Sequence, residues 1–194
     1  MARNGIPDVI ERSITLSGFT PLMFDRYAGD NKTSLPVEAK MYFLPDGKTL
    51  CLPAANLSSF LSAQNTNSVA KLIGGRGYGR LAQAMLSFVI IEPNAIPITR
   101  NGEPVQFYGF VDDVDEKGGI HVERHVARLK NGIPNPKERP VVDLPWEVSF
   151  KLTLFKNDEF DETLLKDAFR RGGIALGIGT FRGVYGKFTV SQWE

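Results

Sequence analysis

The nine residues from Trp146 to Leu154 alternate strictly between apolar and polar side chains. The apolar residues are Trp146, Val148, Phe150, Leu152 and Leu154, and the polar residues between them are Glu147, Ser149, Lys151 and Thr153. Successive side chains of a β-strand point to opposite faces. The segment therefore predicts an amphipathic strand, with one face buried in a core and the other facing solvent.

A helix, a glycine-rich segment and a second strand are expected after this strand. Asp161 is typical of a helix N-cap, and the apolar positions of 164–169 mark one helix face. Glycines 172–173 predict the end of this helix, and residues 188–190 predict a final strand. The order strand, helix, glycine loop, strand is half of a ferredoxin-like fold. We therefore predict one α+β domain over residues 1–194, with a ferredoxin-like (RRM-like) antiparallel sheet, helices and an inserted basic hairpin arm.

The rest of the chain predicts less regular elements and three flexible insertions. The expected elements are a half-buried strand at 12–19, a hairpin at 41–52 around Pro45-Asp46-Gly47, a helix at 53–64, a buried strand at 86–91, and two paired strands at 106–111 and 120–128. Polar, glycine-rich and proline-rich composition predicts the insertions, at 25–34, 65–80 and 129–145.

Composition excludes several classes of protein. The chain has 194 residues, 42% apolar and 23% charged, with a formal net charge of +1. These values are ordinary for a globular domain and exclude a disordered chain, a coiled coil and a collagen. No apolar run is long enough to cross a bilayer, and no secretory signal is recognisable, so we expect a cytoplasmic protein. The single cysteine, Cys51, excludes an internal disulfide framework and a multi-cysteine zinc site.

The segment from Gly172 to Phe188 is the first candidate binding motif, because it holds six glycines within fifteen residues. Exposed N–H groups of such a loop can bind phosphate oxygens, and Arg182 and Lys187 add positive charge. No Gly-Lys-Ser/Thr closes a Walker loop, and a helix stands where a dinucleotide fingerprint needs a strand. The alternative is a tight turn that packs a helix on a sheet.

Two further segments are basic. Residues 71–80 combine Arg76 and Arg80 with Tyr78, which suits phosphate pairing and base stacking, although a solvated loop is the alternative. Residues 117–139 hold six basic residues against two acidic ones, a local net charge of +4 in a nearly neutral chain. Such a patch attracts polyanions; the alternative is a solvated hairpin.

Candidate catalytic and metal-binding residues are few. His121 and His125 are about 13 Å apart if they lie on a strand, too far to share a metal. Either His could still be the general base of a metal-independent ribonuclease. The acidic residues of 112–116 precede two glycines and fit a solvated turn better than a magnesium site. We predict no catalytic residue, no metal site and no cofactor.

The glycine segment resembles the glycine-rich loop of the RAMP superfamily, which processes or coats CRISPR RNA. The resemblance is carried by Gly177-Ile178-Gly179, Arg182 and Tyr185-Gly186-Lys187-Phe188, placed between a helix and a C-terminal strand. Together with Arg139-Pro140, Trp146 and the helix from Asp161, it also resembles short proteins encoded by bacterial viruses. The matching part is residues 139–190, about a quarter of the chain.

The resemblance implies a RAMP-like, RRM-like fold that binds single-stranded RNA or DNA and assembles along it. The chain lacks the histidine near the N-terminus that processing nucleases of the superfamily often have, so the resemblance favours a binding subunit. We predict a non-enzymatic, CRISPR-backbone-like subunit that oligomerises along single-stranded nucleic acid, with RNA the expected ligand, and that has no membrane partner. The expected phosphate ligands are Arg124, Arg128, Lys130, Arg139, Arg182 and Lys187 with the amides of Gly177, Gly179 and Gly183, and further contacts are expected from Arg76, Arg80, Tyr78, Phe181 and Tyr185.

Two alternatives belong to other functional classes. One is a structural or inhibitory viral protein that acts through a protein partner. The other is the metal-independent endoribonuclease that would use His121 or His125.

Overall fold

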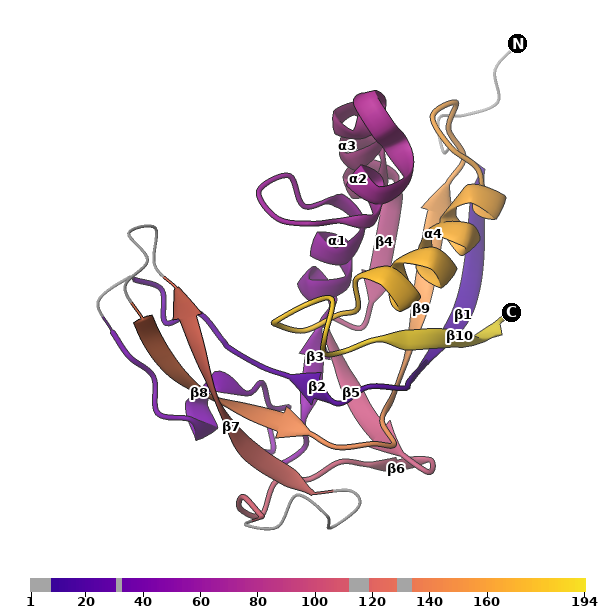
Figure 1. Cartoon of the computed structure of the whole chain (residues 1–194). Coiled ribbons are helices and arrows are strands. Elements are labelled where there is room, and N and C mark those ends of the chain that lie inside the picture. The colour runs from indigo at the N-terminus through magenta and orange to yellow at the C-terminus, as the bar shows by residue number, and fades with distance from the viewer. Residues whose placement is uncertain (1–7, 31–32, 112–118, 129–133) are drawn as a thin grey trace.

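The computed structural model describes residues 8–30, 33–111, 119–128 and 134–194 (Figure 1). Its large sheet is antiparallel, in the order β10-β1-β9-β5-β3, with β4 on β9 and β6 on β5. These strands are β1 (Val9–Gly18), β3 (Cys51–Pro53), β4 (Val89–Glu92), β5 (Ala95–Arg100), β6 (Glu103–Pro104), β9 (Glu147–Phe155) and β10 (Phe188–Trp193). A small sheet, in the order β2-β8-β7, consists of β2 (Leu22–Met23), β7 (Ile120–Arg128) and β8 (Pro134–Val142).

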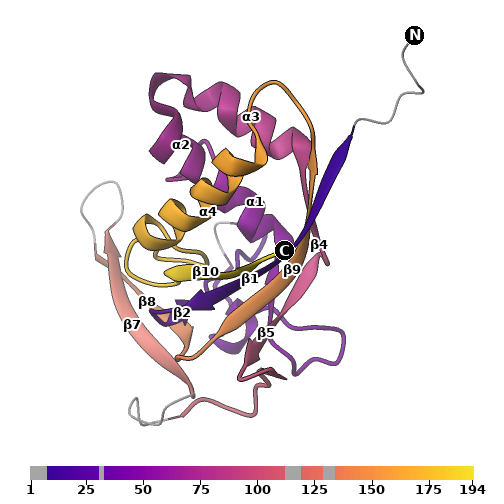
Figure 2. The same cartoon turned by 90° about the vertical axis from the view of Figure 1, so that its right-hand side faces the viewer.

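Helices cover one face of the large sheet and leave the other face open (Figure 2). They are α1 (Ala54–Ser62), α2 (Val69–Gly74), α3 (Tyr78–Phe88) and α4 (Glu162–Ala175), with short 3₁₀ turns η1 (Glu38–Lys40) and η2 (Gly75–Gly77). The α+β, antiparallel fold class is therefore as predicted. Within the described ranges, no helix is long and apolar enough to cross a membrane.

The predicted amphipathic strand is confirmed as β9, the central partner of the large sheet. Its apolar residues Val148, Phe150, Leu152 and Leu154 are buried, whereas Ser149 and Lys151 are exposed. The register with β1 pairs Ile14 with Phe150 and Leu16 with Val148, so both strands send apolar side chains to the helix-covered face. Trp146 enters the same core, and its indole N–H donates to the carbonyl oxygen of Thr20 over 2.8 Å.

The predicted start of α4 is confirmed, but its predicted end is wrong. The Asp161 carboxylate accepts the N–H of Leu164 over 2.8 Å, as an N-cap does. The helix continues through Gly172 and Gly173 to Ala175. A Cβ at Gly172 would lie 2.6 Å from Cζ of Phe60, and one at Gly173 would lie 2.5 Å from the carbonyl oxygen of Phe188. The two glycines therefore permit close packing and do not end the helix.

Residues 69–80, expected to be a loop, are helical. They form α2, η2 and the start of α3, and the expected strand at 86–91 begins only at Val89, where α3 ends. Val69, Ala70 and Ala82 are buried against the other helices. This packing outweighs the low helix propensity of the glycines.

The basic arm is the antiparallel pair β7 and β8, with nine paired positions from Ile120↔Val142 to Arg128↔Pro134. Residues 106–111 were expected to pair with β7 as a strand, and this is wrong. They make one bridge, from Gln106 to Thr49, and the N–H of Val111 donates to the carbonyl oxygen of Ile120. The single domain and its flexible insertions stay predictions.

Candidate nucleic-acid interface at the glycine loop

The glycine loop, residues 176–187, connects α4 to β10 and lies between the helices and the small sheet (Figure 1). Its two halves approach so closely that a Cβ at Gly186, where φ is +67°, would lie 2.9 Å from the carbonyl carbon of Ile178. Only glycine tolerates this combination of left-handed backbone and close approach. The loop is thereby folded onto itself.

The loop amides that were expected to hold phosphate are used inside the protein. The N–H of Gly177 donates to the carbonyl oxygen of Gly172 over 3.0 Å, and that of Gly183 donates to the carbonyl oxygen of Leu176 over 2.6 Å. The N–H of Gly179 donates to Oδ1 of Asn56 over 3.0 Å. The expectation of a phosphate-binding backbone at these glycines is therefore wrong, and they serve the tight structural turn considered as its alternative.

The glycine loop joins the small sheet to the rest of the protein. The N–H of Thr180 donates to the carbonyl oxygen of Met23 in β2 over 2.9 Å, and the N–H of Gly186 donates to that of Pro21 over 2.7 Å. The loop also contacts β7, because the Tyr185 hydroxyl donates a hydrogen bond to the Glu123 carboxylate. These contacts fix the position of the loop against the basic arm.

Glu123 lies at the centre of a polar cluster. Its Oε2 is 2.7 Å from Nε2 of His125, and its Oε1 is 3.1 Å from Nε2 of His121. Nδ1 of His121 is 3.0 Å from Oδ2 of Asp143. Partial burial acts to raise the pKa of Glu123, but hydrogen bonds from Tyr185, His121 and His125 outweigh it, so the pKa is lowered. Burial first, and then the Glu123 carboxylate, raise the pKa of Tyr185.

Two residues expected to contact the ligand are buried. Only 9% of Tyr185 is exposed, and its ring packs against His125 at 5.6 Å, so the expectation that it stacks on a base is wrong. Arg139 is 6% exposed and its Nε donates to Oδ2 of Asp25 over 2.8 Å. The expectation of Arg139 as a surface phosphate ligand is therefore also wrong. Its Nη1 is buried without a hydrogen-bond partner among the described residues.

Phe181 is the aromatic side chain that the loop presents to solvent. Its ring is 43% exposed, although its backbone has a φ of +55°, which non-glycine residues rarely adopt. The ring centroid lies 5.1 Å from that of His125, and Cζ of Arg139 lies 6.0 Å from the ring. Strained conformations of this kind cost about 1–3 kcal/mol and gather at ligand clamps. Phe181 is thus a supported ring that can accept a stacked base.

Two cations stand close to Phe181 in sequence. Arg182 is half-buried, and its Nη1 donates to the carbonyl oxygen of Asn67 over 3.2 Å. Burial lowers the pKa of its guanidinium from the ordinary value. Lys187 is also half-buried, and its N–H donates to Oγ1 of Thr20. Within the described part of the chain, neither side chain has a carboxylate at ion-pair distance, so both charges remain available to an anion.

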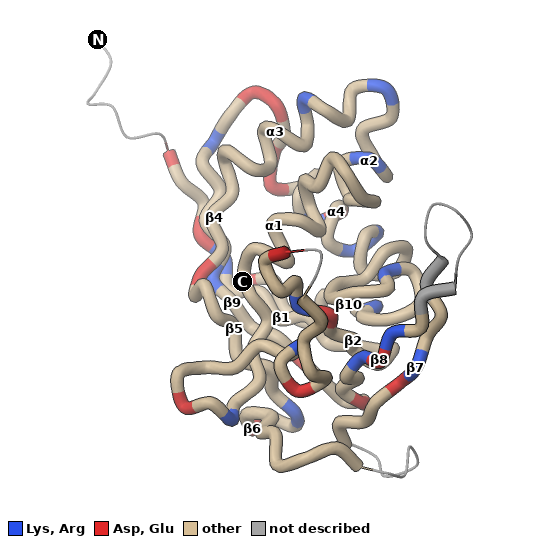
Figure 3. The backbone as a smooth tube through the Cα atoms, turned by 90° about the vertical axis from the view of Figure 1, so that its left-hand side faces the viewer, with Lys and Arg blue, Asp and Glu red and all other residues tan. Residues whose placement is uncertain are grey.

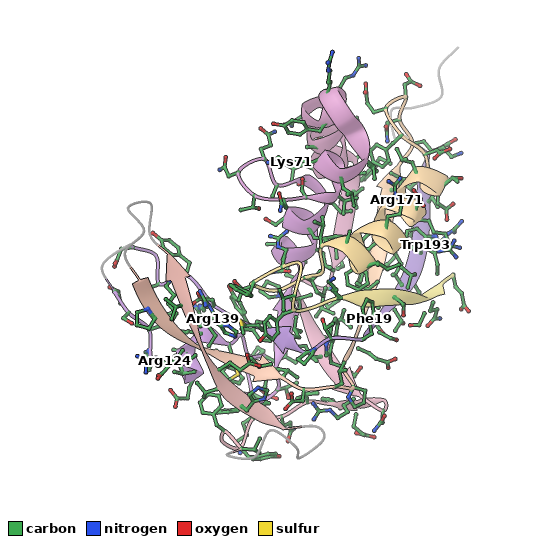
Figure 4. All side chains as sticks on the ribbon, viewed as in Figure 1. Phe19, Lys71, Arg124, Arg139, Arg171 and Trp193 are labelled. Atoms are coloured by element: carbon green, nitrogen blue, oxygen red, sulfur yellow. The ribbon has the colours of Figure 1, made fainter. Side chains whose placement is uncertain are left out.

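Figure 3 shows Lys and Arg positions along both β7 and β8, and Figure 4 labels Arg124 and Arg139 on these strands. Side chains alternate along β7, so Arg124 lies on the strand face opposite to Glu123 and His125. Arg124 is exposed and forms no ion pair with the described residues. The side chain of Arg128 and the whole of Lys130 lie outside the described residues.

The second basic segment is not part of this site. Arg76, Tyr78 and Arg80 lie at the junction of α2 and α3, at the top of Figure 1, away from the small sheet. Arg80 makes two 2.6 Å hydrogen bonds to Glu159, which raise its pKa and lower that of Glu159. Nζ of Lys71 stands 5.5 Å from the Tyr78 ring. The charge of Arg80 is therefore already paired, contrary to the expected phosphate contact.

Sequence reasoning did not foresee the acidic partners of the site. Glu123 could have been found, because residues 121, 123 and 125 share one face of a strand. Asp25 could not, because it reaches Arg139 from 114 residues away. Among the described residues, no group of three His, Cys, Asp or Glu side chains is arranged to hold a metal ion, and acidic residues 112–116 lie outside them.

Comparison with known proteins identifies the fold. No family model matches the sequence, and no curated protein matches it. The chain is similar to a chain in the cryo-EM structure of the Type III-B Cmr-beta bound to cognate target RNA, with a TM-score of 0.58 and 14% sequence identity. The fold is RAMP-like, as predicted. The similarity covers 96% of this chain, which spans 60% of the matched chain. The resemblance to short viral proteins stays a prediction.

In this RAMP-like fold the exposed ring of Phe181 lies in the glycine loop, outside the large sheet. RRM domains stack bases on aromatic residues of their open sheet face. Here the centre of that face carries hydroxyl groups instead, and Oγ1 of Thr15 lies 2.9 Å from Oγ of Ser149, while Ser17 donates to Glu147 over 2.7 Å. The centre of this face therefore presents hydroxyl groups, whereas the exposed Phe181 ring belongs to the glycine loop.

Proposed function

We propose that the protein is a non-enzymatic subunit that binds single-stranded nucleic acid, RNA in preference to DNA, and oligomerises along it. The observation that carries the proposal is Phe181, an exposed ring at positive φ that rests on His125 and Arg139 and is followed by Arg182, a cation with no ion pair among the described residues. The RAMP-like fold, and the fact that the similar Cmr-beta structure is bound to target RNA, support it.

The proposed contacts are of two kinds, base stacking on Phe181 and phosphate pairing with Arg182 and Lys187. A base stacked on Phe181 contributes about 1–3 kcal/mol whatever its identity, since every base has a π-face. Arg182 and Lys187 pair with phosphates, so binding depends strongly on salt. Together they predict a ligand held by backbone charge and stacking, with little sequence preference.

The histidine cluster fits a structural role better than a catalytic one. His121 is buried, and both of its ring nitrogens are within hydrogen-bond distance of carboxylates. Nε2 of His125 is held by Glu123 and lies 3.1 Å from the Tyr185 hydroxyl. A general base must reach the substrate proton, and these nitrogens already have partners.

A metal-independent endoribonuclease is the second candidate, because His125 is half-buried directly beneath Phe181. RNA that is cleaved in EDTA by the wild type and left intact by His125→Ala would establish this activity. Intact RNA with both proteins would dismiss it.

Size-exclusion chromatography of the purified protein with absorbance at 260 and 280 nm tests assembly. We expect a high-mass peak rich in 260 nm absorbance that collapses after RNase treatment. A nucleic-acid-free peak that added oligonucleotides do not shift would contradict the proposal and favour a protein partner.

Fluorescence anisotropy tests the site itself, with labelled oligouridine of about 20 nucleotides, longer than a typical single-domain site. We expect Phe181→Ala to weaken binding about tenfold, the equivalent of one stacked base. Tyr78→Ala is the control, because Tyr78 is 36% exposed and lies at the α2–α3 junction, away from the small sheet. Equal affinity of the two variants would remove Phe181 from the interface.

A further inference from the structure

A second concave site lies along the basic arm. Residues 25–28, 30 and 33–37 and Lys40 of the η1 turn line a cavity of about 650 Å³, together with Arg124 of β7 and residues 136–138 of β8. Arg124, which lines it, points away from the strand face that carries Glu123 and His125. Ligand pockets of small molecules typically measure about 300–1,000 Å³, so the cavity is of the right size for one.

Two cations of the cavity, Lys40 and Arg124, form no ion pair with the described residues, although Glu138 lies opposite Arg124 in the β7–β8 register and lines the same wall. Lys40 is only 9% exposed, and its Nζ donates to the main-chain oxygen of Glu138 over 2.5 Å. Arg124 is exposed at the rim. Asp25, also in the wall, is already paired with Arg139 and lies 3.8 Å from Nζ of Lys137. Across the described ranges, no carboxylate reaches ion-pair distance of Lys40 or Arg124.

A buried ammonium group normally has an anionic partner, because desolvating a charge is costly. Lys40 has a carbonyl oxygen instead of a carboxylate. An anion that enters the cavity would supply the missing charge to Lys40 and Arg124 together. Phosphate is an anion of this kind, with several strong acceptor oxygens for lysine and arginine donors.

The cavity also offers an aromatic ring. Tyr27 lines it and is 63% exposed, and the guanidinium of the neighbouring Arg26 lies 5.6 Å from the Tyr42 ring. An exposed ring in the same wall as Lys40 and Arg124 matches a ligand that combines a planar base with a phosphate.

We propose that this cavity binds a nucleotide, with its phosphate at Lys40 and Arg124 and its base against Tyr27. The nucleotide is either free or part of a strand, and only the second case rests on the proposed function. The proposed ligand groups of this site, Lys40, Arg124 and Tyr27, do not include Phe181, although the wall residue Asp25 is paired with Arg139, whose guanidinium lies 6.0 Å from the Phe181 ring.

Isothermal titration calorimetry with adenosine 5′-monophosphate tests the free nucleotide. We expect saturable binding with a Kd below about 1 mM, which Arg124→Gln weakens about tenfold, as expected for the loss of one charge-assisted contact. Tyr27→Ala is expected to weaken it similarly, and Tyr27→Phe to retain it. Arg171→Gln is the control, since Arg171 is an exposed arginine on α4, on the far side of the molecule (Figure 4).

Anisotropy with labelled oligouridine tests the nucleotide within a strand. If adenosine 5′-monophosphate does not bind but Arg124→Gln weakens the oligonucleotide about tenfold in both wild-type and Phe181→Ala backgrounds, the strand supplies the nucleotide. If Arg124→Gln and Tyr27→Ala leave both ligands unaffected, the proposal is overturned, whether or not Phe181 binds RNA. Lys40→Met keeps the length of the side chain, and its binding is interpreted only if its thermal unfolding matches that of the wild type. Arg124 is exposed, so the Arg124→Gln variant decides the test.

Discussion

The Tyr185 hydroxyl donates a hydrogen bond to Glu123, which connects the glycine loop to β7. The same carboxylate accepts from His125 over 2.7 Å, and the His125 ring lies 5.1 Å from that of Phe181. The exposed ring of the proposed interface therefore rests on a hydrogen-bonded cluster of Glu123, His125 and Tyr185. Binding and stability can be separated by changing the two parts independently.

Tyr185→Phe is expected to destabilise the protein by about 1–3 kcal/mol, because it leaves a partly buried carboxylate without one of its donors. Urea unfolding followed by circular dichroism measures the change. Tyr108→Phe is the control, because the Tyr108 hydroxyl bonds Gln106 at an exposed position. A similar decrease in the free energy of unfolding for the two variants would show that the Tyr185–Glu123 hydrogen bond does not stabilise the protein more than an exposed one does.

The lowered pKa of Glu123 predicts a specific dependence of stability on pH. A carboxyl with a lower pKa in the folded state stabilises the protein when it is ionised, and this contribution is lost as the pH falls through the folded-state pKa. The wild type should exceed Glu123→Gln in unfolding free energy near neutral pH, and the difference should shrink below the ordinary Glu pKa of 4.5. A difference that grows on acidification would contradict the role assigned to the carboxylate.

Local patterns predicted the parts of the fold that depend on local spacing. The alternation of 146–154 identified β9, and the side-chain chemistry of Asp161 identified the N-cap of α4. The helices over 69–80 were missed, because they depend on burying Val69 and Ala70 against distant helices. The glycine content of residues 69–80 predicted a loop, but tertiary packing stabilises helices there.

The candidate site was predicted in part for the same reason. Phe181 and Arg182 were found because glycines mark their loop, but the inward direction of Tyr185 and Arg139 depends on which face of β7 and β8 the loop covers. Arg139 of β8 pairs with Asp25, which follows β2 in the sequence, and no sequence spacing predicts a contact between residues 114 positions apart. Residue type predicted which side chains could bind a nucleic acid, but the tertiary fold determines which of them, such as Tyr185 and Arg139, already have partners inside the protein.

The glycines inside helices predict stability changes of opposite sign. Gly172→Ala should cost about 1–3 kcal/mol, because the new Cβ would meet Phe60 and Val69 in a full core. Gly79→Ala on α3 should gain about 0.5–1 kcal/mol, because nothing lies within 4 Å and alanine favours the helix. Thermal unfolding of both variants checks the pair. If both variants were more stable than the wild type, Gly172 of α4 would have more space next to Phe60 and Val69 than the structure shows.

Arginine variants distinguish paired from available charge in nucleic-acid binding. Arg182→Gln should weaken oligouridine binding about tenfold and reduce the salt slope by about one, as loss of one phosphate contact does. Arg80→Gln removes the same charge, but Glu159 already pairs with it through two 2.6 Å bonds, so affinity and salt slope should stay as in the wild type. Anisotropy titrations between about 50 mM and about 200 mM salt measure both quantities. Equal losses in the two variants would mean that net charge governs binding and the glycine loop does not, because the α2–α3 junction would then contribute as much as Arg182.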